Sequence, residues 1–303
     1  MVRQRSAWTP RGGGLRSRGP MLGLLWLSAL APAGCNDIEG PKPGAPVLAA
    51  FDVVDPAGMP VALTGDGAAA LVSPRSHFAL RFDRLLDGDL LEPTGDGGVM
   101  GAAGVAIITA PGSPRASVVY VPNGDSDFKL LFAPGPQLLI TPIPTLPSGS
   151  TVTVALDKSK FRGKDGLGPY VVAPGISDGV SFATAPFAAS ISAGETGGAA
   201  DAGPAGLAAL AAVTVVFNNL PQEGVAAHIT VQVSPAGGGP SAMTDAAAAP
   251  APSEMDPAIW TVSPKAARWP AGATVTVTVD ATAKDALGMP IAAPAMAVFT
   301  VLP

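Results

Sequence analysis

The sequence predicts an all-β protein with two tandem β-sandwich domains, and three observations support this prediction. The 303 residues include 37 glycines and 33 prolines, which interrupt helices and mark turns between short strands. Val and Thr alternate in two nearly identical segments, as expected of strands with one buried face. The same motifs recur in the same order in both halves of the chain, which indicates a duplicated domain.

The N-terminus has the features of a secretory signal peptide, which we assign to residues 1–34. Five arginines precede an apolar run at 21–31, and small residues follow it. The run of about 11 residues is too short to cross a hydrocarbon layer of roughly 30 Å. Without these arginines, 13 basic and 23 acidic residues remain. We expect no nucleic-acid partner for such an acidic body, because contacts to phosphate dominate that affinity.

Cys35 is the only cysteine, so an intramolecular disulfide is excluded. Its position after two small residues resembles the lipobox of bacterial lipoproteins, with Pro32 where leucine is usual. The resemblance implies a lipid on Cys35, stable membrane anchoring and, because Asn36 follows, passage to the outer membrane. The alternative is a plain signal peptide with an incidental cysteine. Residues 35–46 are expected to form a flexible tether.

The repeated motifs lie at corresponding places in the two halves. The matching pairs are 78–83 with 213–218, 140–142 with 262–264, 147–154 with 270–277, 164–165 with 284–285, and 180–184 with 297–301. We expect further strands at 105–109, 117–121, 129–133, 229–233 and 258–262.

Each Thr-Val-Thr-Val segment, at Thr151–Val154 and Thr274–Val277, is expected to bury its valines and expose its threonines. A Pro-x-Gly turn starts the strand, and a Lys-Asp-x-Leu-Gly turn follows it. In the second turn the Asp is expected to accept hydrogen bonds from nearby backbone, while Gly supplies a positive φ. Short strands with such turns are typical of a sandwich.

This order of motifs resembles the bacterial immunoglobulin-like domains of surface-layer and secreted multidomain proteins. The resemblance implies one β-sandwich over residues 47–187 and another over 188–303. It also implies a role as spacer, stalk or binding unit rather than as an enzyme.

Two stretches fall outside the repeats. The alanine-rich segment 199–213 is expected to form either a helical turn or a loosely packed lead-in to the next strand. The Ala, Gly and Pro-rich segment 235–257 is expected to be an exposed, mobile loop, since it is longer than most connections in compact domains.

The chain has few residues suited to catalysis. Its two histidines, His77 and His228, stand at unequal places in the repeats without a partner at ligand spacing, so we interpret them as strand-edge residues. The letters Gly-x-Ser-x-Gly occur once, at 175–179, but an all-β chain lacks the strand–turn–helix setting of a nucleophile elbow, and no Walker loop occurs in the sequence. A hydrolase would need two carboxylates converging in a cleft, which no motif supports. We therefore predict no enzymatic activity and no cofactor.

Two acidic turns are candidate calcium sites, because calcium prefers hard oxygen ligands in flexible loops. Their candidate ligands are Asp87, Asp89 and Glu92 in one turn, and Asp125 and Asp127 in the other. The alternative is that both are solvated hairpin turns. Trp269, directly before a Pro-x-Gly turn, is a candidate ligand contact if it is partly exposed; the alternative is core packing.

These features predict a non-enzymatic cell-envelope lipoprotein that acts as a structural, spacer or adhesive module. Its partners would be the membrane, through the anchor, and a protein or glycan at the cell surface. The alternative is a surface module that binds glycan or calcium through loops at one tip of a sandwich.

Overall fold

The computed structural model describes residues 44–61, 71–87, 92–93, 100–101, 105–121, 136–163, 165–193, 205–237 and 246–303, all within one compact unit, Pro41–Pro303. Over these residues the chain forms strands and two 3-10 helices, η3 (Lys158–Lys160) and η4 (Val225–His228). The all-β prediction is therefore confirmed for the described chain. Within it, no helix has the length and apolar character needed to cross a membrane.

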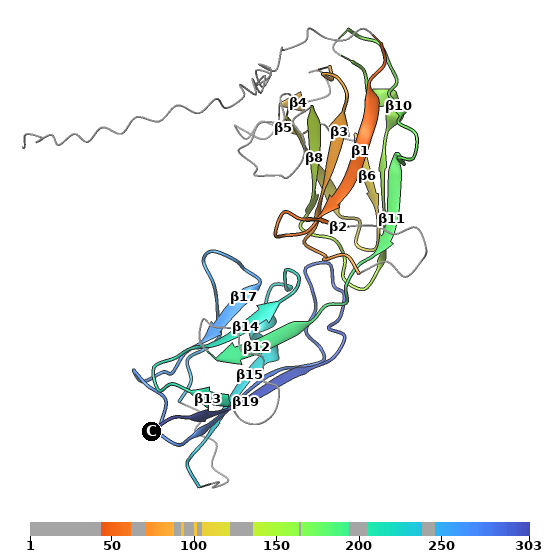
Figure 1. The fold of residues 1–303 in the computed structure, drawn as a ribbon. Coiled ribbons are helices and arrows are strands. Elements are labelled where there is room, and N and C mark those ends of the chain that lie inside the picture. The colour runs from red at the N-terminus through yellow and green to blue at the C-terminus, as the bar shows by residue number, and fades with distance from the viewer. Residues whose placement is uncertain are drawn as a thin grey trace, which may run out of the picture. The chain divides into compact units, whose positions relative to one another are not determined.

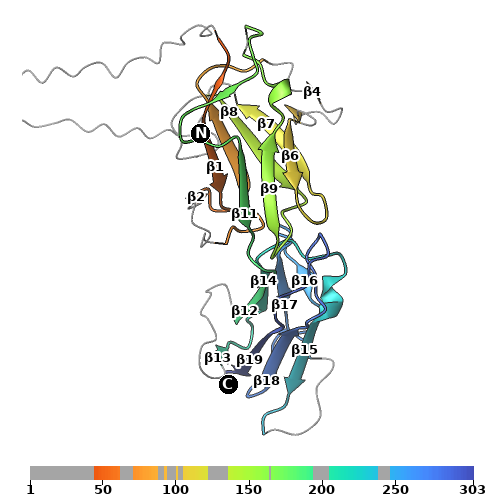
Figure 2. The ribbon, with the colours of Figure 1, turned by 90° about the vertical axis from the view of Figure 1, so that its right-hand side faces the viewer.

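The first β region comprises the described residues of 44–184 and contains two main sheets (Figures 1 and 2). One sheet has the order β10-β1-β3-β8-β7, with β2 paired to β1, and the other has the order β11-β9-β6. β4 and β5 form a separate pair. The strands are β1 (Val47–Val54), β2 (Pro60–Val61), β3 (His77–Phe82), β4 (Glu92–Pro93), β5 (Met100–Gly101), β6 (Ala106–Thr109), β7 (Arg115–Val121), β8 (Gln137–Ile143), β9 (Thr151–Leu156), β10 (Val171–Val172) and β11 (Gly179–Ala183).

Both main sheets of this region contribute to a single hydrophobic core. Phe78 and Leu80 of β3 enter it from the larger sheet, and Val152 and Val154 of β9 enter it from the smaller one. All four side chains are fully buried. Burial of each stabilises the fold by about 1.5–3 kcal/mol.

The second β region comprises the described residues of 187–303 and also contains two sheets (Figure 1). Their orders are β12-β14-β17-β16 and β13-β19-β18-β15. The strands are β12 (Ala189–Ala193), β13 (Ala205–Leu207), β14 (Val213–Phe217), β15 (Ile229–Ser234), β16 (Ala251–Pro252), β17 (Ile259–Val262), β18 (Thr274–Val279) and β19 (Ala295–Val301).

This region has a core of its own, with no residue in common with the first. Val215 and Phe217 of β14 enter it from one sheet, and Val275 and Val277 of β18 from the other. The alternate residues of β18, Thr274, Thr276 and Thr278, are only partly buried. The expected division of valines and threonines between the two faces of the strand is confirmed.

Equivalent hydrogen bonds in the two regions show that the match of 78–83 with 213–218 holds in space. The backbone N–H of Val47 donates to Asp83 Oδ1 over 2.8 Å, and the N–H of Ala188 donates to Asn218 Oδ1 over 2.9 Å. In both regions the residue after the strand's final Phe therefore binds the start of that region's first strand.

The expected match of Asp165 with Asp285 is wrong by two residues. Gly163 donates its N–H to the carbonyl of Leu167, as Asp285 does to that of Met289, over 2.8 and 2.9 Å. Gly163 is therefore the counterpart of Asp285. The sequence match followed the Lys-Asp letters, whereas the turn is defined by its backbone hydrogen bonds.

Most expected strands are observed within two residues of their predicted ends, but 129–133 lies outside the described residues. The segment 235–257 is predicted to be an exposed loop; its residues Ala251–Pro252 are exposed, but they form the short strand β16 against β17. Of the alanine-rich stretch, residues 205–207 form β13, which pairs in parallel with β19. The lead-in alternative applies to that part.

Candidate functional site

The most distinctive polar site is a buried cluster where the two β regions meet, built around the carboxylate of Asp285. Asp285 lies in the turn after β18, which closes at Gly288 with φ +84°. Its Oδ1 accepts hydrogen bonds from the N–H groups of Leu287 and Met289, over 3.0 and 2.8 Å. This oxygen performs the role expected of an Asp in a turn.

The second oxygen of Asp285 binds across the boundary between the regions. Oδ2 accepts from the backbone N–H of Ser148 and from the side-chain amide of Asn219, each over 3.0 Å. The same amide donates to the Ser148 hydroxyl over 2.9 Å and to the Leu146 carbonyl over 3.1 Å. We call Leu146, Ser148, Asn219 and Asp285 the joint.

Local sequence explains how these groups reach one another. Ser148 lies in the Pro147–Gly149 turn that starts β9, and Asn219 lies two residues after the end of β14. The exposed fractions of Ser148, Asn219 and Asp285 are 2%, 0% and 0%. A carboxylate without access to water is tolerated only with good hydrogen-bond partners, and Asp285 has four N–H donors.

Two further contacts connect the two regions. Arg75 of the first region forms an ion pair with Asp256 of the second, with 2.9 Å between Nη1 and Oδ2. Their side chains are 32% and 24% exposed. Solvent therefore screens the pair, and its contribution to the free energy of unfolding is small. Leu287 packs over Gly112, where an added Cβ would lie 3.2 Å from the Leu287 Cβ.

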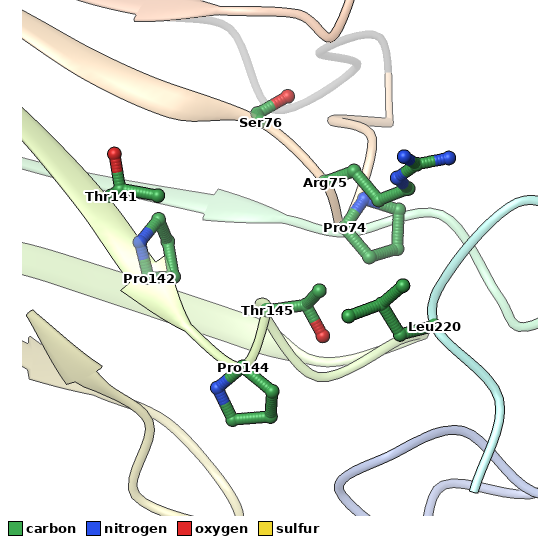
Figure 3. Close-up of a pocket in the computed structure, with 8 residues that line it drawn as sticks. All are labelled: Pro74, Arg75, Ser76, Thr141, Pro142, Pro144, Thr145 and Leu220. Atoms are coloured by element: carbon green, nitrogen blue, oxygen red, sulfur yellow. The ribbon is translucent and has the colours of Figure 1, made fainter. Parts of the chain in front are cut away.

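A small pocket of about 210 Å³ also lies between the regions (Figure 3). Three proline rings form much of its wall, and the leucine is its one lining residue from the second region. The lining residues are Pro74, Arg75, Ser76, Thr141, Pro142, Pro144, Thr145 and Leu220. Its only cationic side chain, Arg75, is already paired with Asp256. The pocket offers mainly apolar contact.

The buried hydroxyls of Ser76 and Thr145 have no hydrogen-bond partner within the described structure. In Figure 3 the hydroxyl oxygen of Ser76 points away from the proline rings. These hydroxyls do not form a converging set of polar groups, such as a catalytic or metal site needs.

A second polar cluster lies on the surface of the second region. His228 Nδ1 is 3.3 Å from both carboxylate oxygens of Asp280 and 3.0 Å from Thr282 Oγ1. Hydrogen bonds from the Thr282 hydroxyl and N–H lower the pKa of Asp280. Because Thr282 and Asp280 meet the same ring nitrogen, the cluster cannot relay a proton through the imidazole. His228 directly precedes β15 and its side chain is 35% exposed, in agreement with its interpretation as a strand-edge residue.

Of the predicted calcium ligands, only Asp87 has its side chain among the described residues. Asp87 follows the first region's β3, and its N–H donates to the Arg162 carbonyl over 2.9 Å. Glu92 is described by its backbone alone, in β4, while Asp89, Asp125 and Asp127 lie outside the described residues. Among the residues that are described, no three His, Cys, Asp or Glu side chains form a metal-binding group.

Trp269 is buried, so the partial exposure that a ligand contact would require is not observed. Its side chain is 1% exposed and belongs to the core of the second region. The indole Nε1–H donates to the Ala211 carbonyl over 2.7 Å. The core-packing alternative therefore describes this residue. Cys35, the predicted lipid-attachment residue, lies outside the described residues.

Comparison with known proteins adds no assignment: no protein-family model matches this chain, and no curated protein is similar to it.

The joint was missed in the sequence because its members resemble ordinary turn residues. Ser, Asn and Asp all favour turns by bonding nearby backbone. Ser148 and Ala271 occupy the same position in the two Pro-x-Gly turns, and Ala271 is exposed. The sequence of the two turns does not indicate which one becomes buried. The one available signal was the pair Asn218-Asn219, where the first copy has Asp83-Arg84.

Proposed function

We propose that this chain is an exported, non-enzymatic cell-envelope lipoprotein whose two β regions are bacterial immunoglobulin-like sandwiches. Together they act as a structural, spacer or adhesive unit held at the membrane through Cys35. The observation that carries the proposal is the buried joint, which connects two separately packed cores directly.

The sandwich assignment is supported by the arrangement of the sheets. In each region two sheets share one core, and valines of β9 and β18 supply its interior. Two sheets packed face to face around interdigitated side chains are the defining feature of a β-sandwich.

The spacer role is supported by the short connection between the cores. Phe182 belongs to the first core and Phe187 to the second, which leaves four residues between them. Adjacent domains normally move relative to each other unless their interface restrains them. Here the interface is a buried set of hydrogen bonds, and a restrained pair of domains suits a spacer.

The anchor role is supported by the contact that begins the first region. The N–H of Gly44 donates to Asp165 Oδ2 over 2.9 Å. Eight residues separate Cys35 from Gly44 in the sequence. Fully extended, they reach at most about 30 Å. A lipid on Cys35 would therefore hold the first region close to the membrane surface.

Cell fractionation tests this proposal. The natural chain is expected in the detergent-extracted membrane fraction, and Cys35→Ser is expected to be lost from it. Asn36→Gln serves as the matched control, because it keeps the cysteine and should remain with the membrane. Recovery of the natural chain in the soluble fraction would overturn the proposal.

A further inference from the structure

Among the described residues, the turns that begin at Asp55 and Asp285 have the same backbone hydrogen bonds, and comparing them isolates a second role for Asp285. Asp55 accepts from the N–H groups of Ala57 and Met59 over 2.9 and 2.8 Å, through Oδ1 alone. Asp285 accepts from residues at the same spacing, also through Oδ1, over 3.0 and 2.8 Å. The closing glycines, Gly58 and Gly288, have φ of +83° and +84°. One carboxylate oxygen is sufficient for this turn.

The Oδ2 of Asp285 is therefore available for the joint. It receives the N–H of Ser148 from the first region and the amide of Asn219 from the second. Asn219 in turn donates to Leu146 and Ser148 of the first region. The two N–H groups of the Asn219 amide thus lie within hydrogen-bond distance of three acceptors, one on Asp285 and two in the first region.

Such a network specifies orientation in a way that apolar contact does not. Burial of apolar surface is non-directional, so it tolerates sliding and rotation of one surface on another. Hydrogen bonds weaken steeply when their angle is poor, and a buried donor without a partner is costly. Any other orientation of the regions would deprive the Asp285 carboxylate of the Ser148 N–H, and would deprive the Asn219 amide of its acceptors on Leu146 and Ser148.

We propose that Asp285 is the positioning residue of this protein: its carboxylate fixes the orientation of the second β region on the first. This proposal rests on the spacer function. It identifies the residue that restrains the motion of the two regions relative to each other.

A distance measurement between the regions tests this proposal. Residues 36–303 include every described residue and no cysteine, so single cysteines can be introduced for spin labels. Ile107→Cys on β6 and Gln232→Cys on β15 place one label on an exposed position of each region. Double electron–electron resonance then reports the distribution of distances between them.

The decisive variant is Asp285→Asn, with Asp55→Asn as its matched control. An amide has a single acceptor oxygen, so residue 285 can then serve the turn or the joint but not both. Asp55→Asn keeps the oxygen that its turn uses. We expect one narrow distance in the parent and in Asp55→Asn. In Asp285→Asn we expect a distribution at least about two-fold broader, because unrestrained domains move by default.

An unchanged narrow distribution in Asp285→Asn, with a native circular dichroism spectrum, would overturn the proposal. If that variant does not fold, Asn219→Ala decides, because it removes the amide that lies within hydrogen-bond distance of Leu146, Ser148 and Asp285 and leaves the turn intact. Broadening supports the proposal and an unchanged distribution overturns it. The distance measurement does not depend on Cys35. Its result can therefore be interpreted even if the fractionation experiment shows no membrane anchoring.

Discussion

The backbone N–H of Ser148 donates a 3.0 Å hydrogen bond to Oδ2 of Asp285, which lies 137 residues later in the chain. Both residues are buried, at 2% and 0% exposure. The bond joins the turn before β9 of the first region to the turn after β18 of the second. Two repeats of one pattern thus make a buried polar contact through residues that are not counterparts.

Replacing the carboxylate should reveal how much this contact stabilises the chain. Asp285→Ala removes the acceptor from four N–H groups, two of them in the joint. We expect a loss of about 2–4 kcal/mol in the free energy of unfolding of the second region. Asp55→Ala removes the acceptor from two turn N–H groups only and should cost about 1 kcal/mol. Urea unfolding of both variants checks this; equal losses would show that the joint adds no stability.

The two faces of β18 should respond differently to truncation. Val277 is fully buried in the second core, whereas Thr276 is only partly buried. Val277→Ala deletes two methyl groups from a packed interior and should cost about 1–3 kcal/mol. Thr276→Ala should change the unfolding free energy by less than about 0.5 kcal/mol. Chemical denaturation measures both, and a larger effect at Thr276 would contradict the assigned faces.

His77 should make the protein less stable in mild acid. Burial lowers its pKa below 6.5, and the nearby Asp55 only partly offsets this. The unfolded chain then binds the proton more readily than the folded chain. The stability associated with His77 is therefore full above pH 6.5 and declines as the pH falls through that value.

The variant His77→Gln should flatten the change in unfolding free energy between pH 7 and pH 5. Burial raises the pKa of Asp52, which acts in the opposite direction, but this residue is present in both proteins and cancels in the comparison. Urea unfolding at a series of pH values provides the measurement. An identical pH slope in both proteins would show that His77 titrates as it does in the unfolded chain.

Calcium and oligosaccharides should leave the melting temperature unchanged if the protein is a spacer. A ligand present at 100 times its Kd would add about 2.7 kcal/mol to stability. For a chain of this size that is a rise of several degrees. Thermal melts with millimolar calcium, and separately with oligosaccharide, distinguish the outcomes. A higher melting temperature with calcium or with oligosaccharide would favour the ligand-binding alternative. The site would then lie in loops that do not include the buried Trp269.

The strands could be predicted because their information is local. In Thr274–Val279 the alternation of Thr and Val matches the two-residue period of a strand, and every valine is buried. The glycine turns were predictable for the same reason, as the positive φ of Gly288 shows. β16 was missed because Ala251 and Pro252 have low strand propensity, and their pairing with β17 decides the conformation.

The joint could not be predicted because it depends on contacts between distant residues. Ser148 and Ala271 occupy the same position in their repeats, yet only Ser148 is covered by the other region. A single sequence does not encode which turn will be covered. Trp269 shows the same limit: its Nε1–H finds the Ala211 carbonyl only once the fold has formed.

The mass of the mature protein tests the account of an anchored spacer most directly. Intact-mass and N-terminal peptide analysis of the chain purified from cell envelopes should show Cys35 as the first residue, carrying acyl chains. A mature chain that starts elsewhere, or a Cys35 without lipid, would contradict the account.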